Sequence, residues 1–457
     1  MNLPLSPGAA KALALLQAAG YEAWIVGGCV RDALLGLPPK DYDLTTSALP
    51  EETQRVFAAY PRIETGLRHG TVTVLLEGEP LEITTYRVDG AYSDARHPDG
   101  VTFTRSLRQD AARRDFTINA MAYAPGQGLQ DFFGGQADLA QGTIRAVGRA
   151  ETRFHEDALR ILRALRFASV LDFTLEAETH QAALACAPLL AAISPERVFS
   201  ELGKLLCGKA AGRVLRTYPQ VLGAVVPEIL PMVGFDQRNA HHCYDVWTHT
   251  AVAVDHVPPE LPLRLAMLFH DIGKPDTFSL GEDGQGHFYG HARRSVEQAE
   301  AILTRLRAPR QVRETVLLLV RYHDAVLEES PQRVRRWLHK LGPDRFFDLL
   351  AIQRGDAAGL APADCTRLEG FQRLEILARE VLSQAPCLTV RDLAVGGEDL
   401  LALGYRGPAI GRALRALLDQ VLSETVSNEK NALLQRLAQM DAENTEKMEP
   451  CSKKKDP

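Results

Sequence analysis

One short stretch, residues 25–46, restricts most strongly what this chain can fold into. An apolar run at 23–26 predicts a strand, which ends at two glycines, Gly27 and Gly28. A glycine lets backbone N–H groups approach a polyphosphate closely, because it has no side chain to keep the phosphate away. A helical segment that carries Arg31 follows. The stretch therefore predicts a strand–turn–helix unit suited to an anionic ligand.

Two aspartates, Asp41 and Asp43, follow a Pro-Pro turn. They project from one face if residues 41–45 form a strand, since side chains alternate along a strand. Neighbouring carboxylates repel each other unless a cation lies between them, and Mg²⁺ held together with substrate phosphates is the usual occupant. An isolated Asp-x-Asp pair is more typical of a surface strand. With Gly-Gly-x-x-Arg-Asp upstream, we predict a nucleoside triphosphate and two metal ions for in-line displacement at phosphorus.

The character of the chain changes at about residue 150. Strands and helices alternate before this point, and the segments 70–76 and 81–86 form a predicted hairpin with its turn at 77–80. Helices rich in Ala, Leu, Arg and Glu follow as far as about residue 438. The change marks a boundary between an α/β head and an all-α remainder.

The bulk properties are those of an ordinary soluble protein. The net charge of −6 does not indicate a nucleic-acid-binding protein, so any such surface must be local. The seven cysteines are odd in number and form no C-x-x-C pair, which indicates reduced thiols and a cytoplasmic location. We expect no signal peptide and no membrane span, since no run of about 18 apolar residues is present.

The string Gly-Gly-x-Val-Arg-Asp-x-Leu-Leu-Gly at 27–36 resembles the polymerase-β-like nucleotidyltransferases. It is most similar to one branch, the bacterial tRNA CCA-adding enzymes and poly(A) polymerases. The string Arg-Arg-Asp-Phe-Thr-Ile-Asn at 113–119 resembles the second motif of that family. The resemblance implies an α+β fold, in which a small head with a five-stranded sheet is followed by an elongated all-α neck, an HD-type body and a tail. The implied domains are a nucleotidyltransferase head at 1–148, a neck with base-recognition and RNA-binding helices at 149–240, an HD-type metal domain at 241–345, a tRNA-binding helical tail at 346–442 and a disordered C-terminus at 443–457.

The same resemblance assigns roles in the head. It implies that Asp41 and Asp43 are catalytic and bind Mg²⁺. It also implies that Gly28, Arg31 and Arg114 bind the triphosphate. Glu82 alternates with apolar neighbours on a predicted strand, and the sequence leaves open whether it is a third carboxylate of the site.

Charged residues recur every three positions at 157–166, so on a helix they lie near one another. Alone, such a row is typical of a solvated surface. In the family, however, a helix of this kind recognises the incoming base, because an Asp accepts from an exocyclic amino group and an Arg donates to a neighbouring acceptor. The resemblance therefore implies that Asp157 and Arg160 select ATP and CTP. Arg163 and Arg166 would contact the phosphates or brace these two residues.

The implied function is that of a CCA-adding tRNA nucleotidyltransferase, which adds C, C and A to the tRNA 3′ end from CTP and ATP without a nucleic-acid template and releases pyrophosphate. A poly(A) polymerase or an A-adding enzyme is the alternative within the family, because both share these motifs.

A loop at 89–105 argues against an enzyme that adds only C, since in the family it reorients the base-recognition helix. Basic residues at 302–340 suit an RNA backbone, although a solvated helix face explains each one singly. An inactive RNA-binding scaffold is a third alternative, which the intact carboxylates and arginines disfavour.

The adjacent pair His270 and Asp271 has a histidine, His249, about twenty residues earlier and an aspartate, Asp324, about fifty residues later. This spacing resembles that of the HD phosphohydrolases. The resemblance implies that these four residues are metal ligands, with His291 and His323 as candidates for a second metal. Imidazole and carboxylate together suit Mg²⁺ or a divalent transition metal such as Mn, Ni or Fe. A metal-dependent phosphohydrolase that acts on RNA ends is therefore the alternative from another class, and a helical domain without activity is the other reading. The sequence leaves the oligomeric state open.

Overall fold

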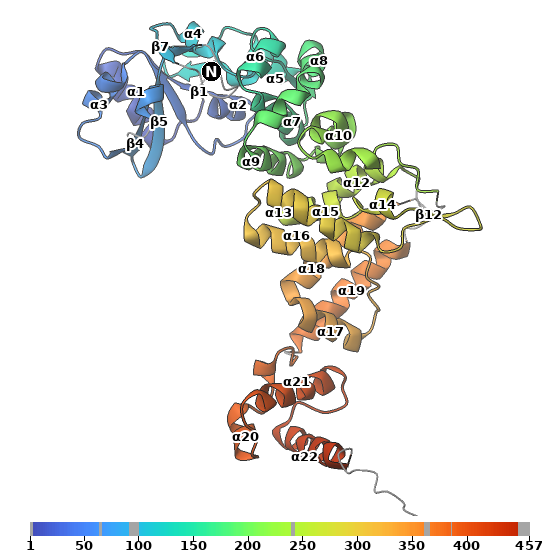
Figure 1. The fold of residues 1–457 in the computed structure, drawn as a ribbon. Coiled ribbons are helices and arrows are strands. Elements are labelled where there is room, and N and C mark those ends of the chain that lie inside the picture. The colour runs from blue at the N-terminus through green and yellow to red at the C-terminus, as the bar shows by residue number, and fades with distance from the viewer. Residues whose placement is uncertain are drawn as a thin grey trace, which may run out of the picture.

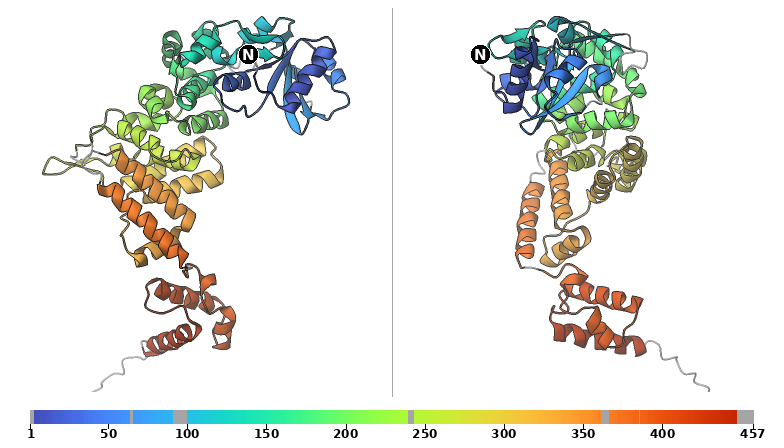
Figure 2. Two further views of the ribbon diagram at one scale, coloured as in Figure 1. Left: turned by 180° about the vertical axis from the view of Figure 1, so that it is seen from behind. Right: turned by 90° about the vertical axis from the view of Figure 1, so that its left-hand side faces the viewer.

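The computed structural model describes residues 3–63, 66–90, 100–238, 243–360, 366–384 and 386–446. Its elements form an elongated molecule, with the sheet-containing head at one end and three helices of the tail at the other (Figure 1; Figure 2). The neck and body lie between them and are helical apart from two short strand pairs. The predicted change from an α/β head to an all-α remainder is therefore confirmed.

The head is built on a seven-stranded sheet in the order β3-β4-β5-β2-β1-β8-β9. The five central strands match the number that the resemblance implied, and the short strands β3 and β9 extend the sheet at its two edges. β2 and β5 run parallel, and all other neighbours in this sheet are antiparallel. The strands are β1 (Ala23–Val26), β2 (Asp43–Thr46), β3 (Arg62–Ile63), β4 (Thr71–Leu76), β5 (Glu79–Thr85), β8 (Met121–Ala124) and β9 (Gly128–Asp131).

The predicted hairpin is formed by β4 and β5, with a tighter turn than the sequence suggested. Leu76 pairs with Glu79, so only Glu77 and Gly78 form the loop. Both have positive φ, 49° and 80°. Two positive φ values are required by the two-residue turn that matches the twist of antiparallel strands, and glycine adopts this conformation without strain.

Both faces of the sheet are covered, which explains why all four residues of β1 are buried. Ile25 packs into a core with Leu44 and Phe57. Trp24 and Val26 point to the opposite face and belong to a second cluster. The helices of the head are α1 (Pro7–Ala18), α2 (Gly28–Leu34), α3 (Pro50–Val56), α4 (Leu107–Ala112) and α5 (Gly135–Ala140).

A short ladder of β6 (Arg87–Asp89) and β7 (Val101–Phe103) forms both ends of the predicted loop at 89–105. Residues 91–99, the centre of that loop, lie outside the described residues. The role predicted for this loop therefore stays a prediction.

The core of the head continues through the neck into the body, where it ends with Leu349 and Ile352 of α18. α18 therefore packs with the body, although the predicted boundary at residue 345 assigns most of it to the tail. The helices of neck and body are α6 (Ala150–Glu156), α7 (Leu159–Leu171), α8 (Ala177–Ala185), α9 (Pro195–Leu206), α10 (Ala211–Thr217), α11 (Pro219–Gly223), α12 (Val246–Asp255), α13 (Leu261–Phe269), α14 (Lys274–Thr277), α15 (His291–Arg305), α16 (Arg310–Tyr322), α17 (Pro331–Leu341), α18 (Pro343–Ala358) and α19 (Thr366–Ser383). The short strands there are β10 (Thr143–Ile144), β11 (Thr174–Leu175), β12 (Ser279–Leu280) and β13 (Gly286–His287).

The tail has a separate core, in which Leu400, Leu417 and Leu433 come from its three helices. These helices are α20 (Gly397–Ala402), α21 (Pro408–Leu422) and α22 (Lys430–Glu446). Since α22 runs to Glu446, the first residues of the predicted disordered segment at 443–457 are helical. Residues 447–457 lie outside the described part. Among the described helices, none is both long and apolar enough to cross a membrane.

Candidate active site

A cavity of about 520 Å³ lies between the head and the neck. All nine residues that the sequence predicted for nucleotide and Mg²⁺ binding line it, although they come from distant parts of the chain. Seven arginines face four aspartates around the cavity, so its wall has an excess of positive charge that suits a polyphosphate. The lining consists of Gly27, Gly28, Arg31, Asp41, Asp43, Arg113, Arg114, Asp115, Asn119, Asp157, Leu159, Arg160, Arg163, Arg166, Phe167 and Arg197.

The two predicted metal ligands lie where β2 begins. Asp43 is the first residue of β2, and Asp41 precedes the strand. Asp43 pairs in register with Glu82 of the parallel strand β5, and the side chain of Glu82 is exposed. The pKa of Asp43 is raised to about 6, first because the neighbouring atoms keep water away from its carboxylate and then because of the charges of Asp41 and Glu82. Arg114 opposes this rise. Carboxylates that are so poorly neutralised by the protein form a fitting site for a hard divalent cation.

Gly27 joins β1 to α2 and packs against Arg114. Its φ is +80°, a conformation that residues with a Cβ atom rarely adopt. A Cβ atom here would also lie 3.3 Å from Nη1 of Arg114. Arg31, one turn into α2, donates from Nη1 to Oδ1 of Asn119 at 2.7 Å. The glycine turn thus brings two arginines to the side of the cavity next to Asp43.

Asp157 lies at a break between two helices, whereas the charge pattern at 157–166 predicted one continuous helix. α6 ends at Glu156 and α7 begins at Leu159, because Asp157 has an extended backbone and accepts from the Leu159 N–H at 3.1 Å. Its other oxygen accepts from Nη2 of Arg197 at 2.8 Å. Arg160 donates to Oε2 of Glu156 at 2.5 Å.

Arg163 and Arg166 are both paired with buried carboxylates. Arg163 donates to Oδ2 of Asp115 from Nε at 2.9 Å and from Nη2 at 2.6 Å. Nε of Arg166 lies 2.9 Å from Oε2 of Glu201. Both guanidinium groups also lie over the ring of Phe167, at 5.6 Å and 4.1 Å from its centroid. This geometry favours the predicted bracing role over direct phosphate contact.

Sequence reasoning missed Arg197 as a residue of the site. It lies in the string Pro-Glu-Arg-Val-Phe at 195–199, which by itself indicates only the start of a helix. Its position beside Asp157 follows from the packing of α9 on α7, for which the sequence has no local signal. Arg113, Asp115 and Asn119 did belong to a motif that the sequence singled out.

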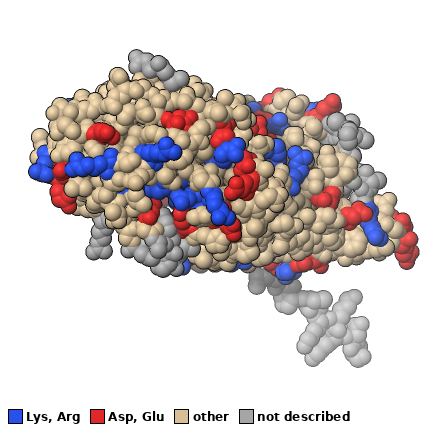
Figure 3. All heavy atoms as spheres, turned by 90° about the horizontal axis from the view of Figure 1, so that it is seen from above, with Lys and Arg blue, Asp and Glu red and all other residues tan. Residues whose placement is uncertain are grey.

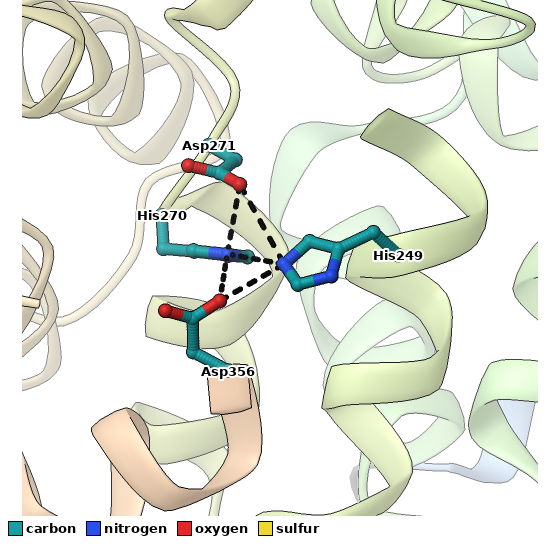
Figure 4. Close-up of side chains that lie close together, drawn as sticks. All are labelled: His249, His270, Asp271 and Asp356. Atoms are coloured by element: carbon teal, nitrogen blue, oxygen red, sulfur yellow. Dashed lines mark hydrogen bonds and ion pairs between the residues drawn. The ribbon is translucent and has the colours of Figure 1, made fainter. Parts of the chain in front are cut away.

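A second group of side chains lies in the body (Figure 4). Nε2 of His249 and Nε2 of His270 are 3.3 Å apart, and carboxylate oxygens of Asp271 and Asp356 lie within 3.6 Å of both. These four ligand atoms are close enough to hold one metal ion. Asp356, from α18, occupies the place predicted for Asp324. That prediction was wrong because His323 turns inward at the end of α16 and leaves the next residue, Asp324, exposed.

The other oxygen of Asp271 lies near His291 and His323, at 3.5 Å and 3.7 Å from their Nε2 atoms. These three residues form a second group of possible ligands. The two Nε2 atoms are 3.2 Å apart. Asp271 therefore faces one histidine pair with each oxygen.

All four histidines of this cluster are oriented by the same kind of contact. Their Nδ1 atoms lie 2.7–3.1 Å from the carbonyl oxygens of Gly359, Met267, Phe288 and Val320. A carbonyl only accepts, so each Nδ1 carries a proton, and each Nε2 offers a lone pair when its imidazole is neutral. Lone pairs that face each other at 3.2–3.3 Å repel unless a cation lies between them, and this arrangement is typical of metal-binding histidines.

The electrostatics of the cluster agree with an affinity for cations. Burial lowers the pKa of His270, but Asp271 and Asp356 outweigh this effect and raise it to about 10, so a proton occupies its Nε2 at neutral pH when no metal ion is bound. The pKa of Asp271 lies well below its ordinary value despite burial, because of His270 and Lys274. Nζ of Lys274 is 2.7 Å from Oδ2 of Asp271.

Three family models match parts of the chain. The poly A polymerase head domain matches residues 23–145, and the probable RNA and SrmB-binding site of polymerase A matches residues 172–218. A putative domain 2 of tRNA nucleotidyltransferases matches residues 288–437.

Related proteins and structures match over most of the chain. A CCA-adding enzyme of Geobacillus stearothermophilus is 49% identical over 422 residues, which are 92% of this chain and 93% of that protein. A CCA-adding enzyme of Lactiplantibacillus plantarum is 53% identical over 194 residues. This match covers 42% of the present chain and about half (47%) of the length of that enzyme. The crystal structure of the Bacillus stearothermophilus CCA-adding enzyme in complex with CTP superimposes with a TM-score of 0.71 at 30% identity, over 97% of this chain and 100% of that one.

Proposed function

This chain belongs to the family of CCA-adding enzymes, and we infer that it adds C, C and A to the 3′ end of tRNA from CTP and ATP. The addition needs no nucleic-acid template and releases pyrophosphate. One observation supports this inference. The cavity between head and neck brings together the carboxylates of Asp41 and Asp43, an excess of arginines and the Asp157–Arg160 pair. Its partners are tRNA, ATP and CTP.

The roles in the reaction follow from the chemistry of each side chain. Asp41 and Asp43 would hold Mg²⁺, which when bound there supplies the charge that activates the tRNA 3′-hydroxyl and neutralises the leaving pyrophosphate. Gly28, Arg31 and Arg114 hold the triphosphate through backbone N–H and guanidinium groups. Arg163 and Arg166 brace the wall of the cavity through Asp115 and Glu201.

Base selection falls to Asp157 and Arg160. Both ATP and CTP present an amino group beside a ring acceptor, which a carboxylate and a guanidinium can recognise together. UTP and GTP present the opposite order. Because Asp157 already accepts from Arg197 and Arg160 donates to Glu156, these partners keep the two side chains in place before a base enters.

An RNA-binding surface is compatible with the negative net charge of the chain. On the face seen in Figure 3, Lys and Arg side chains form a broken band with acidic side chains beside it. A band of this kind suits the phosphate backbone of an RNA. We also propose that the protein acts in the cytoplasm, which the unpaired state of every described cysteine supports.

Single-nucleotide incorporation tests this function. Transcripts of tRNA that end before CCA, after C and after CC are incubated separately with labelled CTP or ATP. We expect CTP to be added to the first two and ATP to the third, and Asp43→Ala to abolish both. Addition of ATP alone would instead support a poly(A) polymerase or an A-adding enzyme.

The histidine cluster supports a second activity, that of a metal-dependent phosphohydrolase acting on RNA ends. The specific observation is the convergence of four Nε2 atoms on Asp271, which fits one or two divalent ions. His249, His270, Asp271 and Asp356 would hold the first ion, and His291 and His323 the second with the other oxygen of Asp271. Nitrogen and oxygen ligands together favour Mn, Ni or Fe over Mg²⁺. A bound ion there supplies an activated water for attack on a phosphate ester.

Elemental analysis of the purified protein tests the metal before any activity is measured. We expect a divalent transition metal that is lost in His270→Ala and retained in His256→Ala, whose histidine is exposed and lies outside the cluster. Nucleotide addition should persist in both variants. If His270→Ala keeps its full metal content, the assignment of the cluster is refuted.

A further inference from the structure

A fully buried carboxylate, Asp110, lies behind the arginine pair of the candidate active site. It belongs to α4, and its exposed fraction is 0%. Burying a charge is costly unless the charge is paired and hydrogen-bonded. The hydrogen-bond partners of Asp110 therefore indicate which part of the structure the buried charge stabilises.

Four donors converge on Asp110, and they come from three parts of the head. Oδ1 accepts from Nε of Arg113 at 2.9 Å and from the Arg87 N–H at 3.3 Å. Oδ2 accepts from Oγ1 of Thr45 at 3.1 Å and from Nη2 of Arg114 at 3.5 Å. One carboxylate thus holds both arginines that line the cavity at this point and also the strand β2.

The strand that Asp110 holds is the one that carries the predicted metal ligand. Thr45 lies two residues after Asp43 on β2, and the two side chains share one face of the strand. Nη2 of Arg114 faces Asp110, while Nη1 of the same guanidinium packs at Gly27 beside the cavity. Asp110 therefore links the position of the guanidinium groups to the position of Asp43.

We propose that Asp110 is a positioning residue for nucleotide addition, which holds Arg113 and Arg114 at a fixed place relative to the metal-binding carboxylates so that the triphosphate meets both. This inference rests on the proposed function of the cavity. Since the triphosphate is common to ATP and CTP, Asp110 acts equally on both nucleotides and has no part in base choice. A carboxylate that merely stabilised the head would leave nucleotide affinity unchanged.

The variant Asp110→Asn tests the proposal, because it keeps the shape and one acceptor oxygen but removes the charge. We expect the KM for CTP and for ATP to rise by about tenfold each, the loss typical of one charge-assisted hydrogen bond. The ratio between the two nucleotides and the KM for tRNA should not change. Affinity for a non-hydrolysable CTP analogue, measured by calorimetry, should fall by the same factor.

Asp138→Asn is the matched control. Asp138 is also buried, with an exposed fraction of 5%, and accepts from Thr117 at 2.7 Å and from Arg145. It is not among the described residues that line the cavity. We expect this variant to lower the melting temperature without raising the KM for either nucleotide.

A lower melting temperature of Asp110→Asn with an unchanged nucleotide KM would overturn the proposal. If that variant does not fold, Thr45→Val provides the measurement. It removes the hydroxyl that joins β2 to Asp110, together with the contact of that hydroxyl to the Thr84 carbonyl on β5, and should raise the KM for both nucleotides several-fold. An unchanged KM in Thr45→Val would then refute the proposal. Absence of addition by the unmodified protein would refute the proposed function instead, while calorimetry would still report on Asp110.

Discussion

Replacing Asp115 with asparagine should loosen the contact between head and neck, and the loss should depend on pH. Asp115 follows α4 in the head, and Arg163 lies on α7 of the neck. Their two hydrogen bonds, at 2.9 Å and 2.6 Å, join the two parts at the cavity. Asparagine keeps an oxygen for Asn119 and the Phe116 N–H, but presents no charge to Arg163.

The magnitude follows from the pKa of Asp115. Burial would raise it, but Arg163 outweighs this effect and lowers the pKa from its ordinary 3.8 to about 2. At about 1.36 kcal/mol for each unit, the ionised carboxylate stabilises the folded state by about 2 to 3 kcal/mol at neutral pH. Because the folded pKa is the lower one, this stability is present above the unfolded pKa of about 3.9 and is lost as the pH falls through about 2. At pH 3 about half of it remains.

Hydrogen exchange of α7, read by mass spectrometry, measures this contribution locally. For an exchange rate that follows the opening equilibrium, this contribution corresponds to an exchange faster by on the order of 50-fold in Asp115→Asn at pH 7. At pH 3 the two proteins should differ by only about tenfold. Asp172→Asn is the control in the same region, because Asp172 is largely exposed and pairs with Arg213 at the surface. An equal effect of Asp115→Asn at both pH values, or none at either, would refute the reasoning.

Three further predictions concern the nucleotide site. The raised pKa of Asp43, about 6, means that protons compete with Mg²⁺ at acidic pH, so Mg²⁺ affinity measured by calorimetry should increase from pH 5 to pH 7, and a constant affinity would contradict this. Gly27→Ala forces a Cβ atom into a backbone with φ of +80°, 3.3 Å from Arg114, and steady-state kinetics should show a several-fold higher KM for both nucleotides; an unchanged KM would mean that the turn tolerates the methyl group. Arg197→Ala removes the partner of Asp157, so competition assays should show at least about tenfold weaker discrimination against UTP and GTP, and unaltered discrimination would exclude Arg197 from base choice.

The sequence predicted those parts of the site whose residues are close together in the chain. Asp43 lies on β2 with Asp41 two residues before it, and Arg113 and Arg114 directly follow α4, so local spacing carries the information. The head residues and the neck residues meet only through tertiary packing. Only the resemblance to a family, and not the periodicity of the sequence, predicted that head and neck residues form one site.

The errors have specific physical causes. The resemblance to HD phosphohydrolases implied Asp324 from its distance along the chain, but a shift of one residue at a helix end turns a side chain from the core to the solvent. Asp356 has no motif around it and reaches the cluster only because α18 packs on α12 and α13. The break at Asp157 was missed because an aspartate that caps the following helix also fits a helical charge pattern. The edge strands β3 and β9 are too short to show a periodicity of their own.

The position of β1 in the sheet has a consequence for synthesis of the protein. β1 lies between β2, which follows it closely in the chain, and β8, so that Ile25 pairs with both Leu44 and Tyr123. During translation, the part of the sheet from β3 to β1 can assemble while the β8 side of β1 still has an open edge. That edge is apolar and can pair with another chain until residue 124 has left the ribosome. Slow translation of the codons before β8 would lengthen the time for which this edge is exposed. Slow translation after β9 would not, because all strands of the sheet have then been synthesised.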